Sequence, residues 1–374
     1  MKINYIANAR IPTEKAHGIQ IMKMCEAFAQ LGNDVTLILP RRIQNREFRL
    51  KNPFEYYNVK PIFKIKKLPC IDLLPLFSNP LAFYIQATSF ALATLFYSLF
   101  TKEDLVYTRD EFSASLLCKK KKVIYEAHVY PQSKHKWFAR WLKSVKKIVV
   151  INNALKKQFS KLAPSEKIAV AHDGVDLKTF KQLPEKHKAK TALKINSKTP
   201  VAMYTGHLYP WKGVDTILDT AKKLPKVMFY VVGGTSKDVK EYHEKIQQKE
   251  LKNVTLTGHV QHTQIPEFLA AADVLLLPNS AKYNISNEYT SPLKLFEYMA
   301  AKRPILASDV TSTKEILEHG KNAILFKADD PYTCAQSLKH LLQNSKLASN
   351  LVKSAYKDVR PYTWELRAKK VLNT

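Results

Sequence analysis

The sequence predicts an α/β protein made of two doubly wound, Rossmann-like domains. In both halves of the chain, short apolar runs alternate with amphipathic stretches of helical length, which is typical of parallel strands covered by helices. The length of 374 residues is about twice that of a typical domain, and a hydrophobic content of 45% suffices for two cores. We therefore expect one domain at 1–185 and another at 195–358, with the lysine-rich segment 178–198 as the linker.

The first half opens as a strand, a turn and a helix. Residues 1–7 form an apolar strand, 16–18 a turn that ends in Gly18, and 19–31 a helix that leads to a strand at 35–39. A glycine at this place lets the backbone approach a phosphate at the helix N-terminus. One glycine does not make the three-glycine fingerprint of a dinucleotide site, so no nicotinamide cofactor is predicted.

Polar residues follow the next strands of the first half. Arg109 comes shortly after the strand 105–107, and Glu126 and His128 follow the strand 123–125. The carboxyl ends of parallel strands form the edge where such sheets bind ligands, which makes these side chains site candidates. A single histidine at a strand end can equally be structural.

The second half repeats this pattern with glycines. The strand 201–205 is followed by Gly206 and His207, and then by Lys212 with a glycine after it. Further strands at 228–232 and 254–257 run into Gly233 and Gly258. An ammonium group at this edge can bind an anion, although a Lys-Gly pair is also a common end of a turn.

The most informative segment is 289–307, YTSPLKLFEYMAAKRPILA. Ser291 suits a helix N-cap and Pro292 the first helical position, so a helix is expected from Pro292 to residue 300 or 301. Lys294 and Glu297 lie three residues apart near its N-terminus, where free N–H groups and the helix dipole attract an anion such as a nucleotide diphosphate. The alternative is a surface charge pair at i,i+3 spacing.

This segment resembles the donor-binding helix of the retaining GT-B glycosyltransferases, which transfer sugars from nucleotide-sugars. In that family a Glu-x7-Glu motif occupies the loop and helix, and Glu297 matches the second glutamate, which bonds the ribose hydroxyls. Tyr289 stands at the position of the first glutamate, and Glu288 is one residue away. The resemblance implies a GT-B fold, with two facing Rossmann-like domains and a cleft between them.

Two other segments of the chain also resemble elements of this family. The run from Gly206 to Gly213 resembles its Gly-Arg-Leu…Lys-Gly element, which grips the diphosphate, with His207 in place of the arginine. The tail from about 360 to 374 resembles its last helix, which crosses back onto the first domain. The resemblance implies a nucleotide-sugar site of Gly18, Gly206, His207, Lys212, Gly233, Gly258, Val260, Tyr289, Ser291, Pro292, Leu293, Lys294 and Glu297, a catalytic centre of His128, Lys212 and Glu297, and acceptor-side candidates Arg109 and Glu126.

The reaction implied by the resemblance is transfer of a hexose-type sugar from a UDP- or GDP-sugar with retention of configuration. Lysines and a helix dipole would stabilise the leaving diphosphate, so neither a metal nor a cofactor is expected. The acceptor would be lipid-linked or a cell-surface polysaccharide. The alternatives are an inverting GT-B transferase and a non-enzymatic basic protein that binds membranes or nucleic acid.

Charge indicates an acidic partner. The net charge is +28, and residues 1–190 hold 34 Lys and Arg against 15 Asp and Glu. Basic residues mix with aromatic ones at 41–67 and 134–147, which suits an anionic membrane surface, unless the aromatic side chains pack on the sheet. Nothing resembles a recognised nucleic-acid module, so no nucleic-acid partner is predicted.

Two further features bear on location. Residues 81–100 are uncharged, but polar side chains dilute the run, and a crossing would separate Gly18 from Lys212, so a core or interfacial helix is expected. The four cysteines have neither metal nor disulfide spacing, and no signal peptide is recognised. We expect a cytoplasmic protein, peripheral on the inner face of the membrane.

Overall fold

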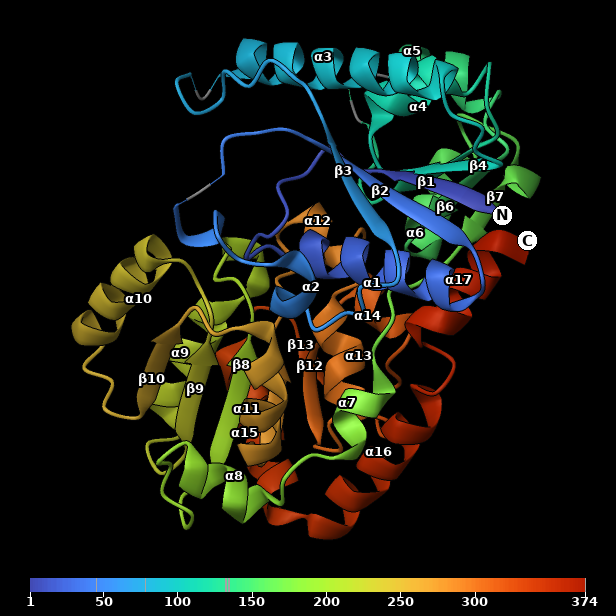
Figure 1. The fold of residues 1–374 in the computed structure, drawn as a ribbon. Helices are drawn as coiled ribbons and strands as arrows, with labels where there is room; N and C mark the ends of the chain where they lie inside the picture. The colour runs from blue at the N-terminus through green and yellow to red at the C-terminus, as the bar shows by residue number, and fades with distance from the viewer. Residues whose placement is uncertain (45, 78, 132, 134, 374) are drawn as a thin grey trace. The chain divides into compact units, whose positions relative to one another are not determined.

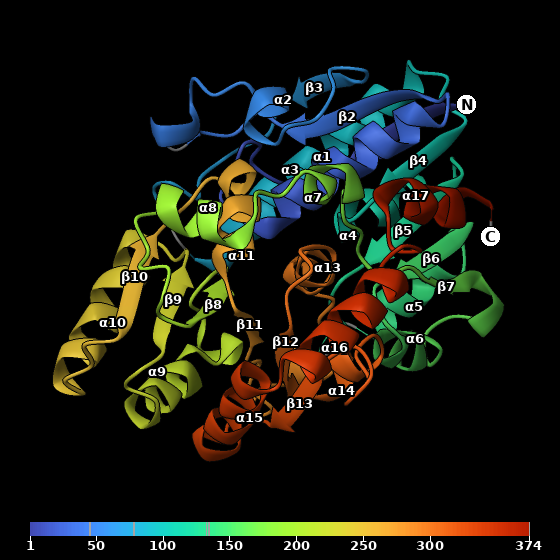
Figure 2. The ribbon, with the colours of Figure 1, turned by 90° about the horizontal axis from the view of Figure 1, so that it is seen from below.

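The computed structural model describes residues 1–44, 46–77, 79–131, 133 and 135–373 (Figures 1 and 2). The chain separates into two compact units. Unit 1 comprises residues 1–172 together with 364–374, and unit 2 comprises residues 173–363. Each unit has its own parallel sheet and its own hydrophobic core, which confirms the expected pair of Rossmann-like domains.

In the described part of unit 1 the sheet has the strand order β3-β2-β1-β4-β5-β6-β7, and every pair is parallel. The strands are β1 (Lys2–Ile6), β2 (Asp34–Pro40), β3 (Lys64–Leu68), β4 (Leu105–Thr108), β5 (Val123–Ala127), β6 (Lys147–Val150) and β7 (Ile168–Val170). The helices are α1 (Ala16–Gln30), α2 (Pro53–Tyr56), α3 (Pro80–Leu99), α4 (Glu111–Leu117), α5 (His135–Leu142), α6 (Asn153–Phe159) and α17 (Trp364–Asn373).

Helices cover both faces of this sheet. The returning helix α17 packs along α1 on one face, while α3 and α4 pack together on the other (Figure 1). Tyr5, Phe28 and Tyr107 form an aromatic cluster between α1 and the central strands, with ring centroids 4.9 to 6.4 Å apart. Strands buried on both faces explain why the sequence shows continuous apolar runs rather than strict alternation.

The described part of unit 2 holds a parallel sheet with the order β10-β9-β8-β11-β12-β13. The strands are β8 (Val201–Thr205), β9 (Met228–Val232), β10 (Val254–Gly258), β11 (Val274–Leu277), β12 (Ile305–Asp309) and β13 (Ile324–Lys327). The helices are α7 (Leu177–Lys181), α8 (Lys186–Ala192), α9 (Val214–Lys223), α10 (Ser236–Gln248), α11 (Ile265–Ala271), α12 (Asn284–Asn287), α13 (Leu293–Ala300), α14 (Thr311–Lys314), α15 (Pro331–Gln343) and α16 (Ser345–Asp358). In both views α13 and α16 lie side by side.

Strand order reverses once in each sheet. In unit 1 the chain leaves β1 toward β2 and later returns to its other side as β4, and in unit 2 β8 lies between β9 and β11. The loops after the strands that flank such a reversal diverge, which leaves room for a ligand at the carboxyl edge. Gly206 and Lys212, which follow β8, therefore lie at the switch point of unit 2.

The expected linker at 178–198 is wrong. This segment forms α7 and α8, and Phe180, Ala189 and Ile195 are buried in the core of unit 2. Its lysines, which suggested a solvated connection, lie mostly on the outside of these short helices. The boundary between the units falls instead at residues 172 and 173.

The aromatic side chains of the two basic segments face inward. In α5, Phe138 and Trp141 are buried against Tyr125 of β5, and in 41–67 Phe48, Tyr57 and Phe63 are buried as well. The interpretation that these aromatic faces lie on a membrane is therefore wrong, because they complete the core. Lys134, at the start of the second segment, lies outside the described residues.

Candidate functional site

Helix α13 positions two charged residues inside unit 2. It begins at Leu293, and its N-cap residue is Pro292, which makes no side-chain cap bond. Ser291, the expected N-cap, accepts a hydrogen bond from the Asp173 N–H instead (3.2 Å). Lys294 and Glu297 are both buried, so their interpretation as a surface charge pair is wrong.

The ammonium group of Lys294 is buried and lacks a hydrogen-bond partner among the described residues. Its Nζ lies 3.6 Å from the centroid of the Tyr204 ring, over the face of the ring. Burial lowers the pKa of Lys294 well below its ordinary value, and the nearby charge of Lys212 lowers it further. Burying an ammonium group without a hydrogen-bond partner is unfavourable, which makes Lys294 a candidate for binding an anion.

Two glycines after β8 shape the loop around this ammonium group. Gly206 has φ +128°, and a Cβ there would lie 2.7 Å from the Lys294 Nζ. Gly213 has φ +73°, and a Cβ there would lie 1.8 Å from the Pro278 carbonyl oxygen. Only glycine fits either position, and the turn at Gly213 fixes Lys212 immediately before it.

Lys212 ends the 3₁₀ turn Pro210–Lys212 at the carboxyl edge of the sheet. The side chain is half-buried, and burial lowers its pKa to about 8. Two lysines with lowered pKa values therefore lie near each other, and the Glu297 carboxylate only partly offsets the lowering at Lys294. Such a pair suits a doubly charged group such as a diphosphate.

Glu297 is held by a residue that sequence reasoning missed. Its Oε1 lies 2.6 Å from the Nε2 of His262, in the 3₁₀ turn His262–Gln264. This turn follows β10 at the same carboxyl edge as Lys212. The signal was present, because His262 comes four residues after the glycine that ends a predicted strand.

His207 belongs to an aromatic stack. Its ring lies 5.1 Å from that of Tyr209, which lies 4.6 Å from that of Trp211, and both pairs are nearly parallel. The hydroxyl of Tyr204 donates to the His207 carbonyl (2.5 Å). The stack fixes the plane of the imidazole at the position where the related family has an arginine.

The remaining candidates of unit 2 lie on neighbouring loops. Gly233 packs on the backbone of Gly206 and forms an isolated bridge with Gly258. Val260 packs on the core. Tyr289 follows α12 and is half-buried, and its N–H donates to the Asn284 carbonyl (3.3 Å). Unit 2 thus brings the candidates from the β8, β9 and β10 loops and from α13 to one edge of its sheet.

Unit 1 holds a second cluster at the end of β5. Glu126 is 1% exposed, and its Oε1 accepts from Gln20 Nε2 (2.6 Å) and from Arg367 (3.0 Å) and lies 2.5 Å from His128 Nε2. Glu126 was expected to face the acceptor, but its carboxylate is enclosed by these partners. That expectation is wrong, and Glu126 instead orients His128.

Arg367 reaches this cluster from α17. Its guanidinium donates to both oxygens of Glu126 and to the carbonyls of Ala171 and His172 at the end of β7. No sequence signal points to this contact, because 241 residues separate Arg367 from Glu126. The last helix therefore supplies the countercharge of the buried carboxylate.

The charges of the cluster follow from these contacts. Burial would raise the pKa of Glu126, but the Arg367 guanidinium and the His128 bond outweigh it and hold that pKa at about 2. Burial and the Arg109 guanidinium lower the pKa of His128 to about 4. At neutral pH the pair is a carboxylate and a neutral imidazole, whose Nε2–H donates to Glu126 and whose Nδ1 keeps its lone pair.

Arg109 and Gly18 complete the unit 1 candidates. Arg109 Nη1 donates to Gln20 Oε1 (2.6 Å), so Gln20 links it to Glu126. Gly18 lies inside α1, which starts at Ala16, earlier than expected. A Cβ at Gly18 would lie 2.1 Å from the hydroxyl oxygen of Tyr57. Glycine is therefore needed here to accommodate Tyr57, and the predicted approach of this loop to a phosphate stays a prediction.

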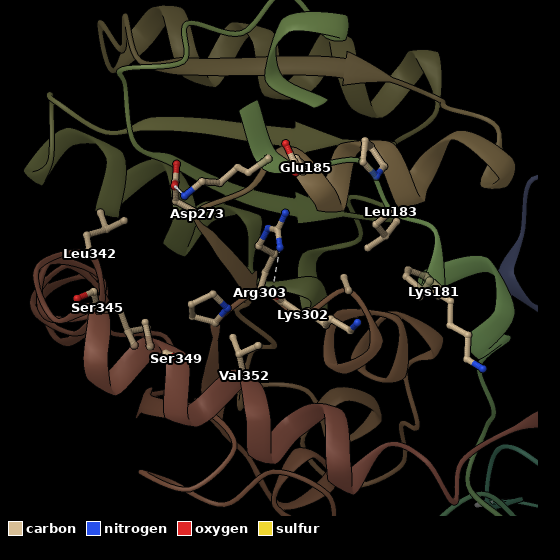
Figure 3. Close-up of a pocket in the computed structure, with 17 residues that line it drawn as sticks. Lys181, Leu183, Glu185, Asp273, Lys302, Arg303, Leu342, Ser345, Ser349 and Val352 are labelled. Carbon is tan, nitrogen blue, oxygen red and sulfur yellow. Dashed lines mark hydrogen bonds and ion pairs between the residues drawn. The ribbon is translucent and has the colours of Figure 1, made fainter. Parts of the chain in front are cut away.

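A separate pocket of about 600 Å³ lies in unit 2 at the opposite edge of the sheet (Figure 3). Asp273 and Arg303 line it, just before β11 and β12 respectively. Asp273 is paired with Lys186 (2.6 Å) and Lys190 (2.7 Å), and Arg303 donates to the Ala270 carbonyl. Because these charges are satisfied by the protein and the pocket is at the amino ends of the strands, we assign it no ligand.

The chain is similar to known proteins along its whole length. Residues 185–358 match the family model of the glycosyl transferases group 1. A glycosyltransferase of Methanocaldococcus jannaschii is 24% identical over 369 residues, which covers 88% of each protein. The alpha-galactosylglucosyldiacylglycerol synthase of Streptococcus pneumoniae is 27% identical over 161 residues, 41% of each protein.

Solved structures agree on the fold. HepE of Anabaena, determined in complex with UDP and glucose, superposes with a TM-score of 0.78 at 16% identity, covering 100% of this chain and 98% of HepE. The family match covers the half that carries the paired lysines and α13, and the structural match covers both units. The chain is a glycosyltransferase with the two-domain GT-B fold, and its residues 185–358 form a glycosyl transferases group 1 domain.

Proposed function

We propose that this enzyme transfers a sugar from a UDP- or GDP-sugar to a lipid-linked or cell-surface polysaccharide acceptor, with retention of anomeric configuration. The observation that carries the donor assignment is the buried, unpartnered ammonium of Lys294, with Lys212 close to it at the switch point of the unit 2 sheet. Two neighbouring lysines, of which Lys294 has no hydrogen-bond partner among the described residues, suit the diphosphate of a nucleotide-sugar.

Neighbouring residues would contact the other parts of the donor, namely the ribose, the base and the sugar. The Glu297 carboxylate, oriented by His262, would accept hydrogen bonds from the ribose hydroxyls. The loop from Gly258 to Val260 would lie beside the base, and Tyr289 beside the transferred sugar. The fold similarity to HepE, whose structure holds UDP and glucose, supports a nucleotide-sugar of this kind.

His128 would act on the transferred sugar. With Nε2–H directed to Glu126, its Nδ1 can accept a hydrogen bond from a sugar hydroxyl. In front-face transfer, the bond from the anomeric carbon to the diphosphate oxygen breaks as the bond to the acceptor oxygen forms. The acceptor proton passes to the leaving diphosphate oxygen, and Lys212 and Lys294 stabilise its charge.

The proposed acceptor is based on sequence similarity to a glycolipid synthase, and the proposed location is based on the net charge. The matched Streptococcus pneumoniae protein is a glycolipid synthase, which supports a lipid-linked acceptor. The net charge of +28 supports contact with an anionic surface. We place the enzyme in the cytoplasm, peripheral on the inner face of the membrane, and expect transfer without a metal ion.

The test is a panel of nucleotide-sugars in a thermal-shift assay, followed by transfer to a synthetic lipid-linked acceptor and NMR assignment of the new linkage. We expect one UDP- or GDP-sugar to raise the Tm, and a product with the donor's configuration. A product of opposite configuration would show an inverting transferase. Absence of both a shift and transfer across the panel would overturn the donor assignment.

A further inference from the structure

Helix α3 buries polar side chains and exposes large apolar ones. Seven of its residues are buried, and three of these are polar, namely Gln86, Thr94 and Ser98. Its outward side carries the large apolar residues Leu81, Leu92, Phe96 and Leu99, with Phe100 just beyond the helix. Phe83 and Tyr84 are also partly exposed, but their rings contact Phe112 of α4. Leu92 is 59% exposed and Phe96 is 65% exposed. A helix that faces water normally has the opposite distribution.

The buried polar groups fix this orientation. Gln86 Nε2 donates to the Asn8 side chain (3.0 Å), and Thr94 Oγ1 donates to Ser113 Oγ of α4 (3.2 Å). Figure 1 shows α3 along the outside of unit 1 with α4 directly beneath it. Rotating α3 to hide its apolar side would break these bonds, so the exposed surface is built into the packing of unit 1.

The apolar face has no charges of its own, but lysines border it at the C-terminal end of α3. Residues 73–101 contain no charged side chain. Lys66 of the neighbouring strand β3 has its Nζ 5.3 Å from the Tyr97 ring centroid. At the same C-terminal end of the helix, Lys121 donates to the Thr101 carbonyl (3.2 Å), which brings the run of lysines from 119 to 122 beside the end of α3. Lys119, Lys120 and Lys122 are exposed.

We propose that the outward face of α3 docks unit 1 on an anionic lipid bilayer, with the helix lying in the plane of the membrane. An apolar helical face with aromatic residues suits the interfacial region, and a border of lysines suits anionic headgroups. This proposal names the surface responsible for the proposed membrane association. The argument for it depends on α3 and not on the donor site.

Two other occupants fit the charges less well. A second copy of the chain would bring the same lysine border against its own, and like charges across an interface oppose association. A transmembrane crossing is allowed by length and composition, since α3 is, among the described residues, the helix long and apolar enough. However, crossing would strip the buried Gln86 and Thr94 of their partners in unit 1.

The experiment measures flotation of the full chain with phosphatidylcholine vesicles, with and without phosphatidylglycerol, at low salt and at about 0.15 M salt. We expect strong binding to anionic vesicles at low salt and a weaker, salt-resistant remainder. Phe96→Ser should reduce binding about tenfold at both salt concentrations, because the variant lacks an aromatic ring that the parent buries in the bilayer on docking. The matched control is Tyr332→Ser, which removes an aromatic ring that is 59% exposed on α15, and which should bind like the parent.

A second variant tests the charged border. The combined change Lys119→Gln, Lys120→Gln and Lys122→Gln should lower binding about a hundredfold at low salt and have little effect on the salt-resistant part. The Tm and the nucleotide-induced thermal shift of every variant should match the parent, so that loss of vesicle binding is distinguishable from failure of the donor assignment.

Three results would overturn the proposal. Equal vesicle binding by Phe96→Ser and the parent would show that α3 does not touch the bilayer. A vesicle-free dimer that Phe96→Ser dissociates would show that a second copy covers the face. Resistance of the bound protein to alkaline carbonate would show that α3 spans the membrane.

Discussion

Lys294 and Lys190 are two buried lysines with different surroundings, and comparing them distinguishes a binding role from a structural one. Its ammonium group is buried over Tyr204 without a hydrogen-bond partner among the described residues, whereas Lys190, also buried, bonds Asp273 (2.7 Å) and the Thr199 carbonyl (2.9 Å). Removing a buried charge that has no partner relieves its desolvation cost and stabilises the fold. Removing one member of a buried ion pair leaves the other charge unpaired and destabilises the fold. The two lysines should therefore respond oppositely to the same substitution.

Lys294→Met should weaken nucleotide binding at least about tenfold and raise the free energy of unfolding by about 1–3 kcal/mol. Lys190→Met should lower stability, because Asp273 loses a partner, and leave nucleotide affinity unchanged. Calorimetric titration and thermal unfolding measure the two effects. Equal destabilisation by both changes would mean that the Lys294 ammonium is satisfied in the free enzyme.

The lowered pKa of Lys212 leads us to expect that the affinity for the donor depends on pH. Burial lowers its pKa to about 8 in the free enzyme, and a bound diphosphate would raise it again by stabilising the charged form. Above pH 8 the free enzyme has lost this proton and must take it up on binding, so affinity should fall about tenfold per pH unit. Below pH 8 the group is already charged, and this dependence disappears.

Calorimetry in buffers of different ionisation enthalpy, using a nucleotide-sugar whose diphosphate does not titrate in this range, measures the proton uptake. Lys212→Arg is the control, since arginine stays charged and removes the Lys212 part of the proton uptake, which leaves the part due to Lys294, whose pKa is also lowered. A parent affinity that is constant from pH 7 to about pH 9.5 would contradict the lowered pKa.

Tyr289 and Glu288 offer two replacements for the missing first glutamate of the motif. Glu288 follows α12 directly, and moving one residue along a tight loop turns a side chain away from its site. Glu288→Gln should therefore retain most transfer activity. A hundredfold lower kcat in this variant, with nucleotide affinity intact, would assign a catalytic carboxylate to Glu288.

At the scale of elements, α17 does more than cover α1. Its Arg367 is the countercharge of Glu126, and Glu126 in turn orients His128. Both side chains of the ion pair are almost fully buried, at 2% and 0% exposure. Removal of either partner leaves the other charge buried and unpaired, which is far more costly than loss of the pair as a whole.

Arg367→Met should lower the free energy of unfolding by about 3–5 kcal/mol, and the double change with Glu126→Gln should restore part of the loss. Lys369→Met is a control on the same helix, because Lys369 pairs with Glu365 at the surface (2.7 Å). Its effect should stay below about 1 kcal/mol. Urea unfolding of the parent, Arg367→Met, Glu126→Gln and the double variant gives the coupling energy, and additive losses would contradict the ion pair.

At the scale of the whole molecule, the proposed mechanism assigns one part of the chemistry to each unit. Unit 2 would supply Lys212, Lys294 and Glu297, and unit 1 would supply His128. The cations that would stabilise the leaving group are side chains of the protein. EDTA should therefore leave the rate of transfer within a few-fold of its untreated value, and strict dependence on added manganese would contradict this assignment.

The sequence by itself determined the two parallel sheets, the strands from β8 to β11, and the placement of Lys294 and Glu297 on one helix. These follow from local periodicity, turn glycines and spacing along the chain, which act within a few residues. It also placed His128 and Lys212 at carboxyl ends of strands, because strand direction fixes that edge.

Only the tertiary structure decided which charges are buried and what holds them. The contact of Arg367 with Glu126 joins residues 241 positions apart, and Tyr57 fills the space beside Gly18 from another segment. The segment 178–198 and the aromatic residues of α5 also became core, although their lysines had suggested a linker and a membrane surface. Burial depends on what packs on a segment from elsewhere in the chain, and the local pattern does not contain that partner.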